Sequence, residues 1–228
     1  MKLHSFEDTE TLNQYFAEQL ASILCQAIAQ RGSAYLVVSG GNTPKDLFKK
    51  LAQTQINWEK VTITLTDERK LPATDKDSNE RLVRDYLLQG FATKATFIGL
   101  CHKTDDALEE EQVETQIAAL PTFDAVILGM GEDGHTASLF PGSPEIHLGL
   151  ADETQRATVS VMPRSAPYPR LSLTKKRLLN SRRLFLHLMG KTKLMIFNEA
   201  MAGQDRFTMP IRAFLHDPTV DIQVMYAP

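Results

Sequence analysis

One histidine stands in a turn that suits proton transfer. His135 ends the segment Gly129-Met130-Gly131-Glu132-Asp133-Gly134-His135, which follows an apolar run. A lone histidine is usually structural, but glycines leave this one sterically free, and its ordinary pKa near 6.5 suits a proton acceptor at neutral pH. We therefore interpret His135 as a candidate general base and Asp133, two residues earlier, as the group that steers or polarises it.

The other histidines have no comparable setting, and no two of them have metal-ligand spacing. We interpret them as surface or packing residues: His4, His102, His147, His187 and His216.

A second glycine loop could hold an anion. It consists of Ser39, Gly40, Gly41, Asn42 and Thr43. Glycines allow backbone N–H groups to approach a phosphate, and a helix capped by Thr43, with Pro44 in its first turn, would point its positive end at the loop. No Gly-Lys-Ser/Thr follows, so this is not a nucleotide P-loop. A tight turn that needs positive φ remains the alternative.

Acids and an arginine follow another apolar run. Thr66, Asp67, Glu68 and Arg69 come directly after residues 61–65. They could form a surface turn, but they also could join the two glycine loops if all three segments lie at one edge of a sheet.

The elements that must position these groups alternate along the chain. Strands are expected at residues 34–38, 61–65, 123–128, 157–161, 170–173, 183–188 and 220–226. Helices are expected at residues 8–30, from Pro44 onward, at 77–90, 105–120, 174–179, 191–201 and 211–215. Because the strands are apolar throughout, we predict an α/β fold, a single Rossmann-like doubly wound domain over residues 1–228 with a mostly parallel sheet and helices on both faces. The three segments would then share a cleft at the carboxyl ends of the strands.

Composition excludes several classes of protein. The chain has 228 residues and a net charge of −3, and no apolar run approaches the roughly 20 residues that cross a bilayer. The N-terminal residues lack a cationic and then apolar leader, so we expect a cytoplasmic protein. Cys25 and Cys101 have no metal-binding or redox spacing, so we expect buried or free thiols and not a disulfide.

The charges are unevenly distributed. Residues 101–155 hold twelve acids and one lysine, whereas residues 156–212 hold twelve Lys/Arg and two acids. This asymmetry could indicate an anionic ligand or two solvated faces. Nucleic acid is the weakest interpretation, because the basic stretch contains no Lys/Arg block interleaved with aromatic residues. The sequence indicates neither an oligomeric state nor a role for the acidic helix expected at residues 105–120.

Residues 123–143 (FDAVILGMGEDGHTASLFPGS) resemble the signature of 6-phosphogluconolactonases, within the wider glucosamine-6-phosphate isomerase/6-phosphogluconolactonase group. Other motifs of that group occur in the same order: SGGNTP at 39–44, TDER at 66–69, DSN at 77–79, PRLSLT at 169–174 and GKTK at 190–193. The resemblance implies hydrolysis of 6-phosphogluconolactone to 6-phosphogluconate in the oxidative pentose phosphate pathway, with no metal or organic cofactor.

The resemblance also implies roles for particular residues. His135 and Asp133 would be catalytic. The substrate-binding set would comprise Gly40, Gly41, Asn42, Thr43, Asp67, Arg69, Arg170 and Lys193. Among them Arg69, Arg170 and Lys193 are candidates for pairing with the phosphate.

Two alternatives remain. Glucosamine-6-phosphate deaminases carry a Glu five residues after the histidine, and Phe140 occupies that place here. A phenyl ring cannot shuttle a proton, so we expect Phe140 to tolerate Leu with only a packing penalty. A sugar-phosphate sensing module would need a DNA-binding unit, for which the first expected helix leaves no room.

Overall fold

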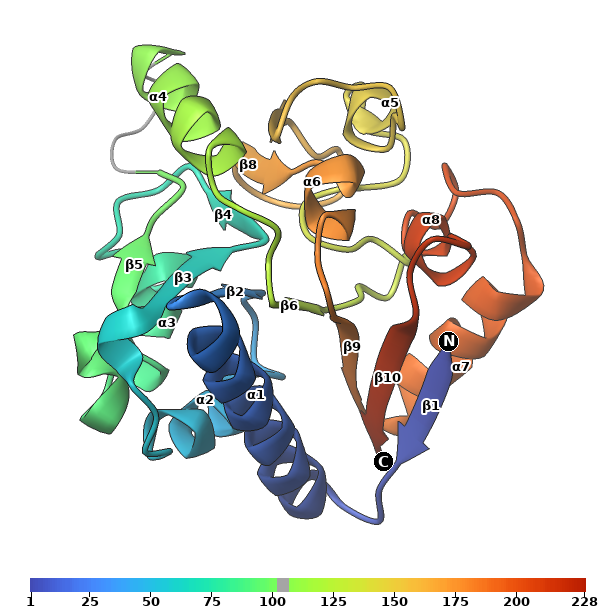
Figure 1. Cartoon of the computed structure of the whole chain (residues 1–228). Helices are drawn as coiled ribbons and strands as arrows, with labels where there is room; N and C mark the ends of the chain where they lie inside the picture. Colours follow the sequence, from blue (N-terminus) through green and yellow to red (C-terminus); the bar gives the residue numbers. More distant parts are fainter. Residues whose placement is uncertain (102–106) are drawn as a thin grey trace.

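The computed structural model describes residues 1–101 and 107–228 and contains a seven-stranded sheet whose paired strands are all parallel (Figure 1). In spatial order the strands are β1 (Lys2–Ser5), β10 (Ile222–Ala227), β9 (Leu184–Met189), β6 (Ala125–Leu128), β2 (Ala34–Val38), β3 (Val61–Leu65) and β5 (Thr96–Ile98). This arrangement confirms the predicted α/β fold. β1 and β5 were not expected, because they are short strands at the two edges of the sheet and carry no continuous buried run.

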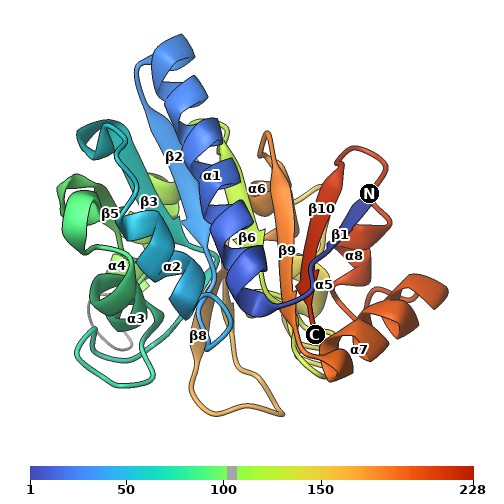
Figure 2. The same ribbon diagram turned by 90° about the horizontal axis from the view of Figure 1, so that it is seen from below.

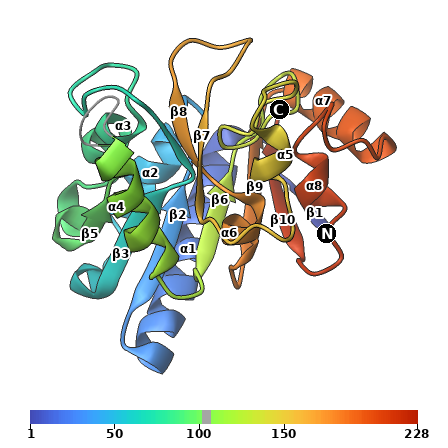
Figure 3. The same cartoon turned by 90° about the horizontal axis from the view of Figure 1, so that it is seen from above.

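Helices cover both faces of the sheet. They are α1 (Thr9–Arg31), α2 (Lys45–Ala52), α3 (Asn79–Tyr86), α4 (Ala107–Ala118), α5 (Ile146–Gly149), α6 (Lys175–Leu179), α7 (Lys191–Ala202) and α8 (Arg212–Leu215). Two short 3₁₀ helices span Trp58–Lys60 and Gly90–Lys94. α1 and α2 lie on the face seen in Figure 2, and α4, α5 and α6 lie on the face seen in Figure 3.

The boundaries of the long first helix follow from its sequence. The Asp8 side chain accepts a hydrogen bond from the Thr11 amide at 2.7 Å and caps its start, and Gly32, with φ of 80°, ends it. Its buried side chains, which include Leu12, Phe16 and Leu20, pack on the sheet. α1 therefore covers the centre of the sheet on this face.

A second, antiparallel sheet corrects the predicted topology. β4 (Asp67–Arg69), β8 (Arg170–Leu173) and β7 (Thr158–Val161) form a separate sheet in the order β4-β8-β7, so residues 157–161 and 170–173 do not extend the parallel sheet. Residues 162–169 are too few for the crossover of about a dozen residues that parallel neighbours need, and they form a loop that projects from the molecule (Figures 2 and 3). Residues Asp67–Arg69, for which a surface turn was the alternative interpretation, form a strand of this sheet.

Several helix boundaries also differ from the prediction. α2 begins at Lys45 with Pro44 as N-cap, so the Thr43 side chain does not cap it. α3 begins at Asn79 after a Ser78 cap and ends at Tyr86, before Gly90. α5 was not expected. Of the acidic helix predicted at 105–120, residues 105 and 106 lie outside the described residues, as does His102.

The register aligns the ends of the central strands. Val38 pairs with Leu65, and Leu128 pairs with Leu186. The segments that begin at Ser39, Thr66 and Gly129 therefore leave the sheet at one edge. Cys25 and Cys101 form no disulfide in the described part of the chain. Within the described ranges no helix combines the length and the apolar character needed to cross a membrane.

Candidate active site

A cavity of about 230 Å³ lies at the carboxyl edge of the parallel sheet, where both glycine loops and β4 meet. Its lining residues are Ser39, Gly40, Gly41, Thr43, Pro44, Asp67, Arg69, Asn79, Gly129, Met130, Gly131, His135, Ala137, Arg170, His187 and Lys193. Every predicted site residue lines it except Asn42 and Asp133. Asn42 is exposed, and Asp133 reaches the cavity only through its contact with His135.

The His135 imidazole is held by Asp133. Nδ1 of His135 lies 2.5 Å from Oδ1 of Asp133, which also accepts a hydrogen bond from the His135 amide at 3.1 Å. The carboxylate thus favours the tautomer that carries the proton on Nδ1 and the lone pair on Nε2. Nε2 has no protein partner in the described part of the chain, so it is available to a ligand.

Burial and this hydrogen bond act in opposite directions on Asp133. Partial burial is the largest single influence and works to raise the pKa of Asp133, but the hydrogen bonds from the His135 side chain and amide and the charge of the imidazole together outweigh it, so the pKa lies below its ordinary value. Asp133 is consequently ionised at neutral pH and supplies negative charge beside the imidazole.

Gly131 makes room for the histidine. A Cβ atom at this position would lie 2.1 Å from Nδ1 of His135 and 2.6 Å from Oδ1 of Asp133. The Gly131 amide also donates a hydrogen bond to the His135 carbonyl at 2.8 Å. Any side chain at Gly131 would therefore displace the His135–Asp133 pair.

The glycine loop at residues 39–43 packs against α3. A Cβ atom on Gly40 would lie 1.9 Å from Oδ1 of Asn79, whose Nδ2 donates to the Asp67 carbonyl at 2.9 Å. Gly41 has φ of 88°, so this loop is a tight turn as well as a cavity wall. The two interpretations of the loop are thus compatible.

Glu68 connects β4 to the start of α3, a role that the sequence did not indicate. Its buried carboxylate accepts hydrogen bonds from the Arg69, Asn79 and Glu80 amides at 2.7–2.8 Å and from the Ser78 hydroxyl at 3.0 Å. Burial raises the pKa of Glu68 although these hydrogen bonds oppose the shift. Glu68 therefore fixes the start of α3, and with it Asn79, against the cavity.

Two arginines at the cavity have unpaired donor groups. Nε of Arg69 and Nε of Arg170 are buried and have no hydrogen-bond partner among the described residues. Other atoms of these side chains do have contacts. Arg69 donates to the Asp77 carbonyl. Nη2 of Arg170 donates to the Pro167 carbonyl at 3.3 Å, its Nη1 lies 3.9 Å from Oδ2 of Asp67, and its Cζ lies 5.1 Å from the centre of the Phe140 ring. Burial lowers the pKa of Arg170. An anionic ligand would satisfy both groups.

Arg170 reaches the site only because of the second sheet. At the start of a strand in the parallel sheet it would lie at the amino edge, opposite the glycine loops. In the antiparallel sheet Arg170 pairs instead with Arg69. Lys193 enters from the first turn of α7, where its Nζ donates to the Met130 carbonyl at 2.8 Å.

Asp67 is fixed by two hydroxyl groups. Its Oδ1 accepts from Thr66 at 2.9 Å and its Oδ2 accepts from Ser138 at 2.5 Å. Ser138 is fully buried and its amide donates to the Ser172 hydroxyl at 3.1 Å. The sequence did not identify Ser138, although it lies three residues after His135 in the same motif.

His187 is a packing residue, as predicted, but it also lines the cavity. It is 3% exposed, and its ring meets that of Phe16 edge-on at 5.4 Å. Neither ring nitrogen has a hydrogen-bond partner among the described residues, and burial lowers the pKa of His187 to about 3. Its place near the carboxyl end of a predicted strand was the signal that could have indicated cavity lining.

The residues around the cavity do not form a metal centre. Over residues 1–101 and 107–228, no group of three or more His, Cys, Asp or Glu side chains could hold a metal ion. The cavity does bring an imidazole paired with a carboxylate close to cationic side chains, an arrangement that suits proton transfer on an anionic ligand.

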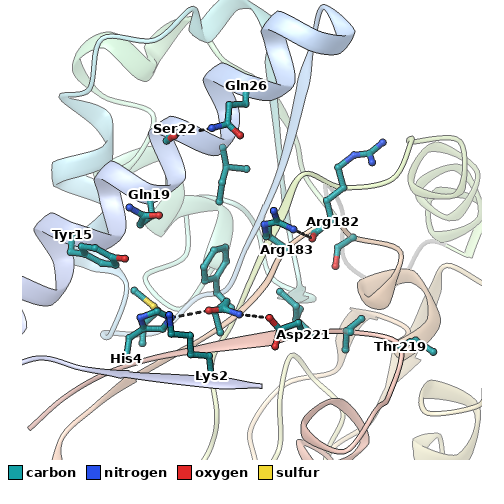
Figure 4. A pocket seen from close by; sticks show the side chains of 17 residues that line it. Lys2, His4, Tyr15, Gln19, Ser22, Gln26, Arg182, Arg183, Thr219 and Asp221 are labelled. Carbon is teal, nitrogen blue, oxygen red and sulfur yellow. Dashed lines mark hydrogen bonds between the residues drawn. The ribbon is translucent and has the colours of Figure 1, made fainter.

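A larger groove of about 610 Å³ lies elsewhere, at the amino ends of β1, β9 and β10 beside α1 (Figure 4). Its labelled side chains include Lys2, Arg182, Arg183 and Asp221, and Tyr15 points into it from α1. It contains none of the residues predicted to act on a substrate. The smaller cavity is therefore the candidate active site.

The chain is similar to known proteins over nearly its whole length. The family model "Glucosamine-6-phosphate isomerases/6-phosphogluconolactonase" matches residues 7–222. A 6-phosphogluconolactonase of Pseudomonas putida is 42% identical over 222 residues, covering 96% of this chain and 90% of that protein. One of Rhizobium meliloti is 39% identical over 228 residues, covering 99% of this chain and 98% of that protein.

Solved structures include a similar protein. The crystal structure of a 6-phosphogluconolactonase from Shewanella baltica OS155 superposes with a TM-score of 0.96 at 41% sequence identity and covers 100% of this chain and 98% of that chain. With the family model matched over most of its length, this chain belongs to the glucosamine-6-phosphate isomerase/6-phosphogluconolactonase family.

Proposed function

We propose that this protein hydrolyses 6-phosphogluconolactone to 6-phosphogluconate, a step of the oxidative pentose phosphate pathway, with His135 as general base. The relatives at about 40% identity are 6-phosphogluconolactonases, which supports the substrate. The pairing of His135 with Asp133 supports the assignment of the base.

In this mechanism Nε2 of His135 takes a proton from a water molecule while the water oxygen attacks the lactone carbonyl carbon. The carbonyl π electrons move to its oxygen and form a tetrahedral oxyanion. When this intermediate collapses, the bond from the carbonyl carbon to the ring oxygen breaks, and the imidazolium returns its proton to that oxygen. Asp133 stabilises the imidazolium between the two transfers.

The observation that carries the proposal is the juxtaposition of a free Nε2 on His135 with unpaired cationic donors on Arg69 and Arg170 in one cavity. Those arginines and Lys193 would bind the phosphate, and the glycine loop at Gly40 and Gly41 would add backbone N–H groups. The energy of phosphate binding would then orient the lactone carbonyl toward His135.

The test is lactone hydrolysis corrected for spontaneous ring opening. We expect the wild-type protein to hydrolyse the lactone and His135→Ala to lower kcat by about 10² to 10⁴, the usual cost of losing a general base. Circular dichroism would verify that the variant is folded. If His135→Ala retained the wild-type kcat, another group would have to activate the water.

The same assay separates the two alternatives. The protein should release no ammonia from glucosamine 6-phosphate, because Phe140 cannot transfer a proton. A sensing module would bind 6-phosphogluconate, for example in calorimetry, without consuming the lactone. Ammonia release at a rate comparable to lactone hydrolysis would favour the deaminase.

A further inference from the structure

Phe140 is in contact with two side chains of the candidate site. Its ring centroid lies 4.2 Å from that of His135, with 31° between the ring planes, and Cζ of Arg170 lies 5.1 Å from the Phe140 centroid. The ring separation is slightly shorter than the roughly 4.5–7 Å usual for aromatic pairs, so the two rings are in close contact, and the Arg170 distance is within the roughly 6 Å of a cation–π contact. Phe140 is therefore more than an apolar filler at the position of the missing Glu.

The backbone around Phe140 is also fixed. Its carbonyl accepts hydrogen bonds from the Ser143 hydroxyl at 3.0 Å and the Ser143 amide at 3.3 Å, and Phe140 itself is 2% exposed. The Leu139 amide donates to the Thr136 carbonyl at 3.0 Å, which closes the turn that joins His135 to Phe140. A buried ring on an anchored backbone provides a rigid platform for the imidazole.

We propose that Phe140 is a positioning residue that fixes the plane of the His135 ring and stabilises its protonated form. This inference rests on the proposed function only for its kinetic consequence, since the ring contact exists independently of any substrate.

The hydrogen bond to Asp133 cannot by itself orient the base. It fixes Nδ1 of His135, but the ring can still swing about that contact, which would move Nε2 away from the water molecule. The Phe140 face removes this freedom. The negative face of a phenyl ring also attracts a cation, so the contact becomes more favourable when His135 carries the proton.

The positive charge of Arg170 near the same ring opposes the stabilisation of protonated His135 by Phe140. Oδ2 of Asp67, 3.9 Å from Nη1 of Arg170, offsets part of that charge. Phe140 therefore contacts the base and the substrate-binding arginine at once, and the expectation that Leu would be tolerated at this position is replaced by an expectation of lost turnover.

The first test compares Phe140→Leu with Phe123→Leu. Phe123 is an equally buried phenylalanine that also contacts an arginine, with Cζ of Arg177 at 3.7 Å, but it precedes β6 at the opposite edge of the sheet. We expect Phe140→Leu to lower kcat about three- to thirtyfold, as expected for loss of a cation–π contact, and to change KM less. Phe123→Leu should leave kcat near wild type. Equal effects on kcat in the two variants, or an effect of Phe140→Leu on KM alone, would overturn the proposal.

The second test keeps the shape of the ring. Phenylalanines with one, two and three fluorine atoms, incorporated at position 140, weaken the negative face stepwise. We expect kcat to fall with each fluorine while the thermal midpoint of unfolding stays constant. A constant kcat across the series would overturn the stabilisation of the protonated ring.

A third measurement does not depend on turnover. Stacking on Phe140 should shift the Cε1–H resonance of His135 upfield, and Phe140→Leu but not Phe123→Leu should abolish that shift. An unshifted resonance in the wild type would overturn the positioning role. Absence of lactonase activity in a wild type that retains the shift would instead overturn the proposed function alone.

Discussion

At the residue scale, the polar groups of the site divide into two sets. Glu68 and Asp67 have their oxygens engaged by neighbouring amides and hydroxyls, so they define the shape of the cavity. Nε of Arg69 and Nε of Arg170 are buried donors with no hydrogen-bond partner among the described residues. Because buried donors without partners are unfavourable, these two groups indicate where an anionic ligand makes its contacts, beside the acceptor nitrogen Nε2 of His135.

Arg69→Ala tests this division. We expect KM for the lactone to rise about ten- to a hundredfold, because a charge-assisted hydrogen bond is worth roughly 1.5 to 3 kcal/mol. The kcat should change less, since Arg69 is not in contact with His135 in the proposed mechanism. Steady-state kinetics with 6-phosphogluconate as a competing inhibitor would measure both effects.

Arg69→Lys is the matched variant, because it keeps the charge but loses the planar donor Nε. An intermediate KM would support a specific role for the guanidinium. If Arg69→Ala left KM unchanged, the phosphate contacts would have to come from Arg170 and Lys193.

The sequence predicted part of this site. A short segment determines the pair Asp133–His135, since two residues of spacing and flanking glycines suffice to bring the groups together. The contact of Phe140 with Arg170 joins residues 30 positions apart and depends on how two sheets pack, which no local pattern encodes. For the same reason the interaction of Glu68 with the start of α3 was not predicted.

At the element scale, the acidic helix α4 has an internal function. Glu114 accepts hydrogen bonds from the Ala157 amide at 2.8 Å, the Thr158 amide at 2.7 Å and the Thr158 hydroxyl at 2.6 Å. Glu110 contacts Lys70 and accepts from the Ser160 hydroxyl at 2.7 Å. These carboxylates bind the edge strand β7, which pairs with β8 and so supports Arg170 in the cavity. The periodicity predicted both the helix and the strand but could not indicate that one covers the other.

Glu114→Gln should therefore destabilise the protein. The amide replaces one acceptor oxygen by a donor that faces the backbone N–H groups of Ala157 or Thr158, and a buried donor left unsatisfied costs about 1 to 3 kcal/mol. We expect a loss of that size in the free energy of unfolding, measured in urea. Glu111→Gln is the control on the same helix, because the ion pair of Glu111 with Arg156 is exposed and worth about 0 to 1 kcal/mol. Equal losses in the two variants would contradict the role of Glu114.

At the scale of the whole molecule, the charge asymmetry is partly neutralised within the chain. The acidic residues Asp124 and Asp152 form ion pairs with the basic residues Arg182, Lys175 and Arg206. Ion pairs therefore join the acidic segment 101–155 to the basic segment 156–212. The asymmetry does not by itself indicate a charged macromolecular partner.

The two sheets are also joined through one residue. The Thr66 amide donates to the Val38 carbonyl of the parallel sheet at 2.9 Å, and the Leu173 amide of the antiparallel sheet donates to the Thr66 carbonyl at 2.8 Å. We propose on this basis that the chain is a single domain, which should unfold in one cooperative transition.

The free energy of unfolding of this domain should depend on pH through His187. Burial among Phe16 and neighbouring side chains lowers the pKa of His187 to about 3, whereas the ordinary value near 6.5 applies in the unfolded chain. Between these values the unfolded state binds one more proton than the folded state. The contribution of His187 is therefore fully present above about pH 6.5 and is lost as the pH falls, by up to about 1.4 kcal/mol per pH unit.

His187→Leu removes the titrating group while it keeps an apolar side chain in the same space. We expect the free energy of unfolding of the wild type to fall by about 2 kcal/mol more than that of His187→Leu between pH 7.5 and pH 5, as determined by urea denaturation at each pH. His147→Leu, at an exposed histidine, is the control for the substitution itself. If the free energy of unfolding varied with pH in parallel for the wild type and His187→Leu, His187 would have to acquire a partner in solution or leave its buried position. The acid sensitivity of the fold would then have to come from its buried carboxylates.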